Sequence, residues 1–289
     1  MKKAVKILAL AMSVLLTFAL ASCKASFDSE KNISVVARED GSGTKSAFME
    51  IIGLKGKKDV SGVIVATSTQ AVLTEVKSNM YAIAYDSLGY VTDEVKTLKV
   101  DGVEATAENI KSGAYKVSRP LSVVYKEATL DDATNSAFFT FLKSKEAQEI
   151  ITANGYVSSL DTAESYTKAN VNGKITLTGS TSLKPLMEKL AAKFEEIESG
   201  VEVSVGGGGS GTGYNDAKNG VSTFGMISEK FKESKAEGCT SHIVALDGIA
   251  VIVNKENPLD DISLDSLKNI YNVDSGDSAI KTWKQVLGE

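Results

Sequence analysis

Short apolar segments alternate with amphipathic segments along most of the chain. Apolar runs predict strands at 33–37, 62–67, 81–85, 121–125, 175–179, 201–205, 224–227 and 249–253. Apolar residues at helical spacing predict helices at 45–52, 70–78, 135–152, 183–194, 263–271 and 280–287. A polar stretch at 159–174 has the composition of a connector or an exposed hairpin arm. Strands that alternate with helices are typical of α/β layers with largely parallel sheets.

The first residues have the pattern of an export signal. Lys2, Lys3 and Lys6 precede an apolar run at 7–20, and "LASC" follows, ending at Cys23. A transmembrane anchor is the alternative, but the run is too short for one. We therefore predict a lipoprotein signal peptide at 1–22 and a lipid attached to Cys23, in preference to a plain secretory signal. A short polar tether at 23–31 would then hold the protein on the extracellular face of a bacterial cell membrane.

Composition narrows the function. The formal net charge is −5, and removal of a signal that carries three lysines and no acid would make it −8. An acidic chain is a poor partner for nucleic acid, so we expect none. With Cys23 lipidated, Cys239 has no cysteine left to pair with. His242 is the only histidine, and we predict a structural role for it and neither a metal site nor a cofactor.

Three loops share one design, in which a strand ends, a Gly/Ser/Thr turn follows and a helix begins. They are "REDGSGT" at 38–44, "TGSTS" at 178–182 and "GGGGSGT" at 206–212. Each turn places backbone N–H groups at the positive end of a helix dipole, which favours anions. One such loop would be only a capped helix N-terminus. Three loops, two of them with the same tetrapeptide "GSGT", predict a shared oxyanion.

Arg38 and Asp40 add a cation to this prediction. Arg38 directly follows the apolar run at 33–37, at the end of a strand where open α/β sheets bind ligands. An arginine recognises a tetrahedral oxyanion with two parallel hydrogen bonds. Asp40 could hold the guanidinium in place, whereas a surface ion pair is the alternative for the two residues.

Enzyme motifs fit less well. "GGGGSG" at 206–211, with Glu229 beyond it, has the spacing of a dinucleotide-binding loop, but a glycine run satisfies that spacing by composition alone. Neither "GSGT" belongs to a P-loop. A G-x-S-x-G nucleophile turn fails because Thr212 stands where glycine is required. We find no pair of nucleophile and base, and we predict that the protein is not an enzyme.

The same segments resemble a known family, the phosphate-binding protein of the bacterial ABC phosphate importer (the PstS family). The resemblance rests on "REDGSGTKSAF" (38–48), "TGSTSLKPLMEKLAAKFEE" (178–196), "VEVSVGGGGSGTG" (201–213) and "ALDGIAVIVNKENP" (245–258). It implies a type II periplasmic-binding-protein fold, in which two lobes close over one phosphate ion. It also implies a monomer that delivers phosphate to a membrane permease without a cofactor.

The resemblance carries binding roles onto individual residues. It implies phosphate-binding roles for Arg38, Ser42, Gly43, Thr44, Thr181, Ser182, Ser210 and Glu229, with Asp40 bracing the arginine. Glu229 departs from the family, whose members have an aspartate that accepts the phosphate proton, or an arginine, at that place.

The order of the segments also departs from the family. Members run from the "GSTS" loop to the tryptophan helix and only then to "REDGSGT", whereas this chain has the two halves exchanged. We therefore expect a circular permutation, with one lobe made of 31–114 plus 255–289 and the other of 115–254. The two "GSGT" turns would then face each other from opposite lobes.

Three other functions are alternatives, and the lone histidine argues against the last of them, an enzyme. The site could bind another oxyanion, such as sulfate or molybdate. The protein could be a phosphate-sensing or adhesive surface lipoprotein without a permease. A phosphatase-like enzyme would need a metal or a nucleophile cluster.

Overall fold

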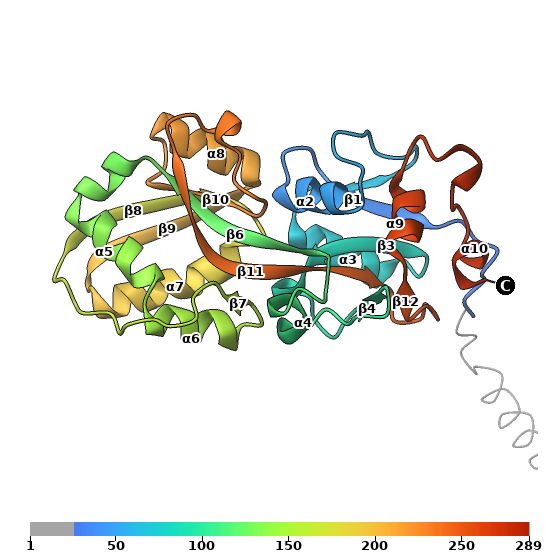
Figure 1. Cartoon of the computed structure of the whole chain (residues 1–289), viewed down its shortest axis with the longest axis horizontal. Coiled ribbons are helices and arrows are strands. Elements are labelled where there is room, and N and C mark those ends of the chain that lie inside the picture. Colours follow the sequence, from blue (N-terminus) through green and yellow to red (C-terminus); the bar gives the residue numbers. More distant parts are fainter. Residues whose placement is uncertain (1–25, 289) are drawn as a thin grey trace, which may run out of the picture.

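Two lobes joined by two long strands make up the computed structural model, which describes residues 26–288 (Figure 1). The long strands are β6 (Ser118–Tyr125) and β11 (Thr240–Val253), and both run along the middle of the molecule. They connect the strands of both lobes into one sheet with the order β2-β1-β3-β11-β6-β10-β8-β9, with β4 and β7 beside β11. The fold is the mixed α/β fold that the alternating pattern predicts.

The first lobe carries Arg38 and is called the arginine lobe. Its strands are β1 (Ser34–Arg38), β2 (Ile64–Ala66), β3 (Ala82–Ser87), β4 (Lys96–Thr97), β5 (Lys99–Val100) and β12 (Asp261–Ile262). Its helices are α2 (Gly43–Ile51), α3 (Thr69–Ser78), α4 (Ala107–Lys111), α9 (Leu264–Tyr271) and α10 (Trp283–Leu287). β1 pairs in parallel with β2 and β3. Helices α2 and α9 pack on one face of these strands, and α3 packs on the other.

The second lobe carries the glycine run 206–209 and is called the glycine lobe. Its strands are β7 (Val157–Ser158), β8 (Asn172–Gly179), β9 (Gly200–Gly208) and β10 (Phe224–Ile227). Its helices are α5 (Ala133–Leu142), α6 (Lys145–Ala153), α7 (Lys184–Ile197) and α8 (Ser210–Asn219). β8 pairs in parallel with β9 and β10. Helices α5 and α7 cover one face of these strands, and α8 covers the other.

The change from one hydrophobic core to the other falls inside the two long strands. Ile249, Val251 and Val253 of β11 pack in the core of the arginine lobe, whereas Val244 and Ala245 of the same strand pack in the core of the glycine lobe. The expected limits of the glycine lobe, 115 and 254, therefore differ from the observed change of core, which lies between Val117 and Leu121 and between Ala245 and Leu246. At the crossing each long strand carries a charged residue, Arg119 in β6 and Asp247 in β11, and the two form a buried ion pair at 3.1 Å. Such an interruption of an apolar run does not by itself indicate a change of lobe.

Two local predictions differ from the structure. The helix expected at 135–152 is two helices, because Ser144 caps α6 through a hydrogen bond from the Ala147 backbone N–H to its Oγ. The glycine run expected to be a loop continues strand β9 as far as Gly208, with Gly179 of β8 paired beside it.

The segment before β1 packs on the lobe and is not a free tether. The ring of Phe27 lies 5.4 Å from that of Tyr81 and 5.7 Å from that of Trp283, measured between centroids. The prediction of a tether is therefore wrong for residues 27–31, because this aromatic side chain finds an apolar partner. Cys23 and the predicted signal peptide lie outside the described residues.

The two ends of the described chain lie side by side on the arginine lobe (Figure 1). The backbone N–H of Trp283 donates to the Lys31 carbonyl at 3.2 Å, and that of Lys284 donates to the Ser29 carbonyl at 2.7 Å. Asn32 also pairs with Thr282 as an isolated antiparallel bridge. The segments at 29–32 and 282–284 are therefore hydrogen-bonded neighbours, as the exchanged order of halves predicts.

Candidate anion site

The loop after β1 supplies the small donors of the arginine lobe. Ser42 is the N-cap of α2, and its Oγ accepts a hydrogen bond from the Lys45 backbone N–H at 3.3 Å. Gly43 and Thr44 are the first two helical residues, and both are buried. The first N–H groups of a helix have no partner within the helix and point along its positive end. Ser42, Gly43 and Thr44 therefore lie where the sequence predicts them, at a helix N-terminus.

Arg38 reaches from β1 to both lobes. Its side chain is 1% exposed. The guanidinium donates two hydrogen bonds to the Glu39 carboxylate, at 2.8 and 2.7 Å. It also donates to the Oγ1 of Thr69 at 3.4 Å and, across the lobes, to the Oγ1 of Thr181 at 3.1 Å. A buried guanidinium held in this way is pre-organised to recognise an oxyanion.

The acid that holds Arg38 is Glu39, and the prediction that Asp40 does so is wrong. The Asp40 side chain is 99% exposed, and its carboxylate pairs with Lys45 at 2.8 Å. The hydrogen bond and the charge of Lys45 lower the pKa of the Asp40 carboxyl. The two acids are adjacent in the sequence, and only the path of the turn decides which of them folds back on the guanidinium.

The loop between β8 and α7 supplies hydroxyl groups of the glycine lobe. The Oγ of Ser182 lies 2.9 Å from the Oγ1 of Thr44. The Oγ1 of Thr181 lies 3.2 Å from that of Thr69, in addition to its bond with Arg38. Thr181 and Ser182 therefore meet the arginine lobe directly, as expected for residues that close on a common ligand.

The two "GSGT" turns face each other across the lobes. Ser210 is the first residue of α8, and a Cβ added to Gly43 would lie 2.2 Å from its Oγ. The Gly211 backbone N–H donates to the Gly41 carbonyl at 3.0 Å. Only glycine allows so close an approach of the two turns. The lobes thus touch along the loops that the sequence singles out.

Two further hydroxyl residues belong to this group and were not predicted. Thr69 begins α3 behind the N-cap Ser68 and touches Arg38, Thr181 and Ser182. Its segment "TSTQ" also follows a strand, but it lacks the glycine by which the sequence pattern identifies the other three loops. Ser228 follows β10, and its backbone N–H donates to the Oγ of Ser210 at 3.0 Å.

Glu229 is buried, but its carboxylate already has three donors. It accepts from the Oγ of Ser46 at 2.5 Å, from Lys232 at 2.7 Å and from Lys235 at 2.6 Å. Burial alone would raise the pKa of this carboxyl, but the hydrogen bonds from the two lysines and Ser46 outweigh it and lower the pKa. The structure therefore does not support Glu229 as a free acceptor for a proton of the anion. It instead places Glu229 in a contact between the lobes, because Ser46 belongs to α2.

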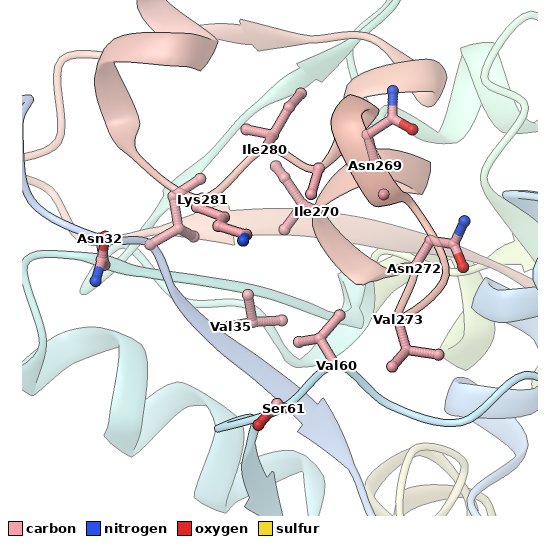
Figure 2. A pocket seen from close by; sticks show the side chains of 13 residues that line it. Asn32, Val35, Val60, Ser61, Asn269, Ile270, Asn272, Val273, Ile280 and Lys281 are labelled. Atoms are coloured by element: carbon pink, nitrogen blue, oxygen red, sulfur yellow. The ribbon is translucent and has the colours of Figure 1, made fainter.

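A separate cavity of about 450 Å³ lies in the arginine lobe near the start of β1, whereas Arg38 ends that strand (Figure 2). Val35, Val60, Ile270 and Ile280 are among its apolar lining residues. Its lining includes asparagine amides and one lysine, Lys281, but no arginine and no carboxylate. This cavity has neither the helix N-termini nor the hydroxyl groups of the facing loops.

His242 lies against an aromatic side chain of α5, apart from the anion loops. The His242 ring packs edge-on against Phe139, with 5.1 Å between centroids, and burial lowers its pKa to about 4. This contact agrees with the structural role predicted for it. Among residues 26–288, no group of three or more His, Cys, Asp or Glu side chains could hold a metal ion.

Two lobes, two crossing strands and loops that meet at helix N-termini define a periplasmic-binding-protein-like fold. The chain matches the family described as PBP superfamily domain over residues 24–146 and 164–289. It belongs to the PBP superfamily and, within it, to the family of the phosphate-binding protein PstS 2.

The most informative relatives are streptococcal. The chain is 37% identical over 263 residues to "Phosphate-binding protein PstS 2" of Streptococcus agalactiae serotype V, covering 87% of this chain and 89% of the relative. The crystal structure of a phosphate-binding protein of a phosphate ABC transporter from Streptococcus pneumoniae TIGR4 aligns with a TM-score of 0.71 and 33% identity, covering 88% of this chain and 99% of that one. The match to "Phosphate-binding protein PstS" of Bacillus subtilis is 35% identical but covers only 46% of this chain and 43% of the relative. These relatives are named as binding and transport proteins, not as enzymes.

Proposed function

We propose that the chain captures inorganic phosphate between its two lobes and delivers it to an ABC phosphate permease. The observation that carries the proposal is the meeting of Arg38 with hydroxyl groups of both lobes, Thr69 at the N-terminus of α3 and Thr181 just before α7. The full-length similarity to PstS 2 supports phosphate as the anion. We assign phosphate-binding roles to Arg38, Ser42, Gly43, Thr44, Thr181, Ser182 and Ser210, and we add Thr69 to them.

Binding energy in such a site comes from charge-assisted hydrogen bonds. The guanidinium and the helix N-termini provide fixed donors, and closure of the lobes removes water around them. Hinge closure of this kind is common in binding proteins of this class. The contacts between Gly41 and Gly211 and between Thr44 and Ser182 belong to the closed arrangement. We therefore expect phosphate to stabilise the contact between the lobes.

The proposal includes a lipid anchor. The segment that ends in "LASC" supports lipidation of Cys23, which would hold the protein on the outer face of the cell membrane. None of the helices within residues 26–288 has the length and apolar character that crossing a membrane requires. Mass spectrometry of the protein isolated from cell membranes would test the anchor. We expect diacylglycerol on Cys23, and an unmodified Cys23 would contradict it.

The proposal also includes a circular permutation relative to part of the family. A permuted chain aligns over its full length only with relatives that share its order, and over one half with the others. The streptococcal match is nearly complete, and the Bacillus match covers less than half of either chain. The hydrogen-bonded neighbours at 29–32 and 282–284 support the same interpretation.

Calorimetric titration with phosphate, arsenate, sulfate and molybdate tests the proposed ligand. We expect phosphate and arsenate to bind at least about 100-fold more tightly than sulfate, which corresponds to about 2.7 kcal/mol. A preference for sulfate or molybdate would favour a binding protein for another oxyanion. No binding of any of the four would contradict the proposal, and a surface lipoprotein without a transport role would then be the better hypothesis.

A further inference from the structure

A buried carboxyl group at the end of β3 has an oxygen without a partner. Asp86 is 0% exposed. Its Oδ1 accepts a hydrogen bond from the Ser87 backbone N–H at 2.8 Å, whereas its Oδ2 has no hydrogen-bond partner among the described residues. Leaving a buried polar oxygen unpaired is costly, and such a group in a native fold calls for an explanation.

Asp86 and Arg38 lie three residues beyond the last paired residues of two neighbouring parallel strands, and the charge of Arg38 acts on Asp86. β1 and β3 are parallel, with Val35 opposite Ile83, and the same register continued by three residues puts Arg38 opposite Asp86. Paired residues of neighbouring strands project to the same face of a sheet. Here that face is the one covered by α3, whose first residue Thr69 accepts a hydrogen bond from Arg38. Asp86 therefore lies at the carboxyl edge of the sheet, on the face from which the guanidinium reaches the loops.

The positive charges around Asp86 are already engaged elsewhere. Arg38 is held by Glu39, and Arg119 donates to the Asp247 carboxylate at 3.1 and 3.4 Å. No ion pair joins Asp86 to either arginine within residues 26–288. The ionisable groups that influence Asp86 are Arg38 from β1, Arg119 from β6, Asp247 from β11 and Tyr156 from the segment before β7.

These surroundings favour the neutral form of the carboxyl group. Burial raises the pKa of Asp86 well above its ordinary value, and Asp247 adds to the effect. The hydrogen bond from Ser87 and the charges of Arg38 and Arg119 offset it only in part. An anion that entered beside Arg38 would repel an ionised Asp86, so binding and protonation of this group must be coupled.

We propose that Asp86 is a further ligand residue of the anion site, and that its Oδ2 shares one proton with the bound oxyanion. This inference rests on the proposed function. The neutral acid can donate its proton to the dibasic phosphate ion, or the carboxylate can accept the proton of the monobasic ion, and the two descriptions contain the same atoms. Sulfate has no proton near neutral pH, so it uses only the first arrangement, in which the acid donates.

Calorimetric titration over a range of pH tests the inference with the wild type and the Asp86→Asn variant. Sulfate is the clean probe because it does not titrate in this range. Above the pKa of Asp86 in the free protein, wild-type affinity for sulfate falls by about tenfold per pH unit, since each complex requires one proton. The affinity of Asp86→Asn stays constant, because an amide donates without titrating. For phosphate, the ratio of the wild-type affinity to the variant affinity is compared, because the ionisation of phosphate affects both proteins equally and cancels. We expect this ratio to fall by about tenfold per pH unit as well.

The outcomes separate this inference from the function on which it rests. Parallel pH profiles for wild type and Asp86→Asn with phosphate would overturn the role of Asp86 while leaving phosphate binding intact. Failure of the wild type to bind phosphate would instead overturn the proposed function. Asp40→Asn is the matched control, because this exposed carboxylate lies on the Arg38 loop and should leave the profile unchanged.

A measurement on the wild type alone covers the case in which Asp86→Asn does not fold. The enthalpy of phosphate binding is compared in two buffers with different ionisation enthalpies, at a pH above the point where the wild-type affinity for sulfate begins to fall, so that Asp86 is ionised in the free protein. We expect an uptake of about one proton per phosphate bound. An uptake of zero would overturn the inference.

Discussion

At the scale of single residues, Arg38 holds a carboxylate of its own lobe and a hydroxyl of the other. Its guanidinium is bound by Glu39 and Thr69 on one side and by Thr181 on the other. A charged group with partners in both lobes contributes to ligand binding and to closure at once. Removing the guanidinium also leaves the Glu39 carboxylate without its partner. The unpaired carboxylate would then repel the anion, which weakens binding further.

We therefore expect Arg38→Ala to weaken phosphate binding strongly. Losing one partner of a buried charge pair costs about 2–5 kcal/mol, or about 30-fold to several thousand-fold in Kd. Calorimetry measures the change, and Asp40→Ala is the control, because its exposed carboxylate should matter by less than about twofold. Binding by Arg38→Ala within threefold of the wild type would contradict the site.

Glu229 gives a second test at this scale. Its carboxylate joins Lys232 and Lys235 of the glycine lobe to Ser46 of α2. Glu229→Gln weakens this contact between the lobes, and we expect about 10- to 150-fold weaker binding of phosphate, which corresponds to the roughly 1.5–3 kcal/mol of a hydrogen bond to a charged group. The ratio of phosphate to sulfate affinity should stay the same. A phosphate-to-sulfate ratio that falls by more than threefold would show that Glu229 contributes to anion selectivity. Glu233→Gln, at an exposed position nearby, is the control.

At the scale of elements, the sequence predicts the local pattern that recurs in the anion loops. It does not predict contacts that depend on the path of the backbone. The strand, glycine turn and helix of each anion loop are local patterns, so Ser42, Thr181 and Ser210 were predicted in their places. The choice between Glu39 and Asp40 depends on one turn, and the role of Asp86 depends on the register of two strands far apart in the chain. Thr69 lies in a loop of the same design but without a glycine, and a search for strand ends followed by Ser/Thr caps would have found it.

The contact between the two "GSGT" turns predicts an effect of Gly43→Ala. An added Cβ would lie 2.2 Å from the Oγ of Ser210, so the turns could no longer approach and phosphate binding should weaken by at least about tenfold. Alanine is a better helix former than glycine by about 0.5–1 kcal/mol, so thermal stability without phosphate should not fall. Measuring Kd and Tm together separates the two effects.

Gly207→Ala is the matched control for this variant. A Cβ at Gly207 would have its nearest neighbour at 3.5 Å, which is ordinary contact. We expect it to bind phosphate within about twofold of the wild type. Wild-type binding by Gly43→Ala would show that the two turns do not close on the ligand in this way.

At the scale of the whole molecule, the two crossing strands and the paired ends determine how the chain can be divided. β6 and β11 pass between the lobes and pair with each other, so a cut in either would interrupt the sheet that joins the two cores. The ends are joined through hydrogen bonds at 29–32 and 282–284. The connector at 159–174 is more constrained than its composition indicates, because the buried carboxylate of Glu198 accepts hydrogen bonds from Tyr166, Ala169 and Val171.

These constraints locate a break that the fold should tolerate. Asp161 and Thr162 are exposed and lie before the part of the connector that Glu198 holds. We expect a chain that starts at Thr162, continues through Glu289 and a short Gly/Ser linker to Ser26, and ends at Asp161, to fold and to bind phosphate within about threefold of the wild type. The linker is feasible because neighbouring termini tolerate such a rearrangement, and Gly/Ser linkers span about 5–6 Å × √n. Circular dichroism and calorimetry check fold and binding.

A matched chain broken between Ile175 and Thr176, inside β8, should not fold, because the break would interrupt the pairing of β8 with β9. Equal behaviour of the two rearranged chains, whether both fold or neither does, would contradict this division of the molecule.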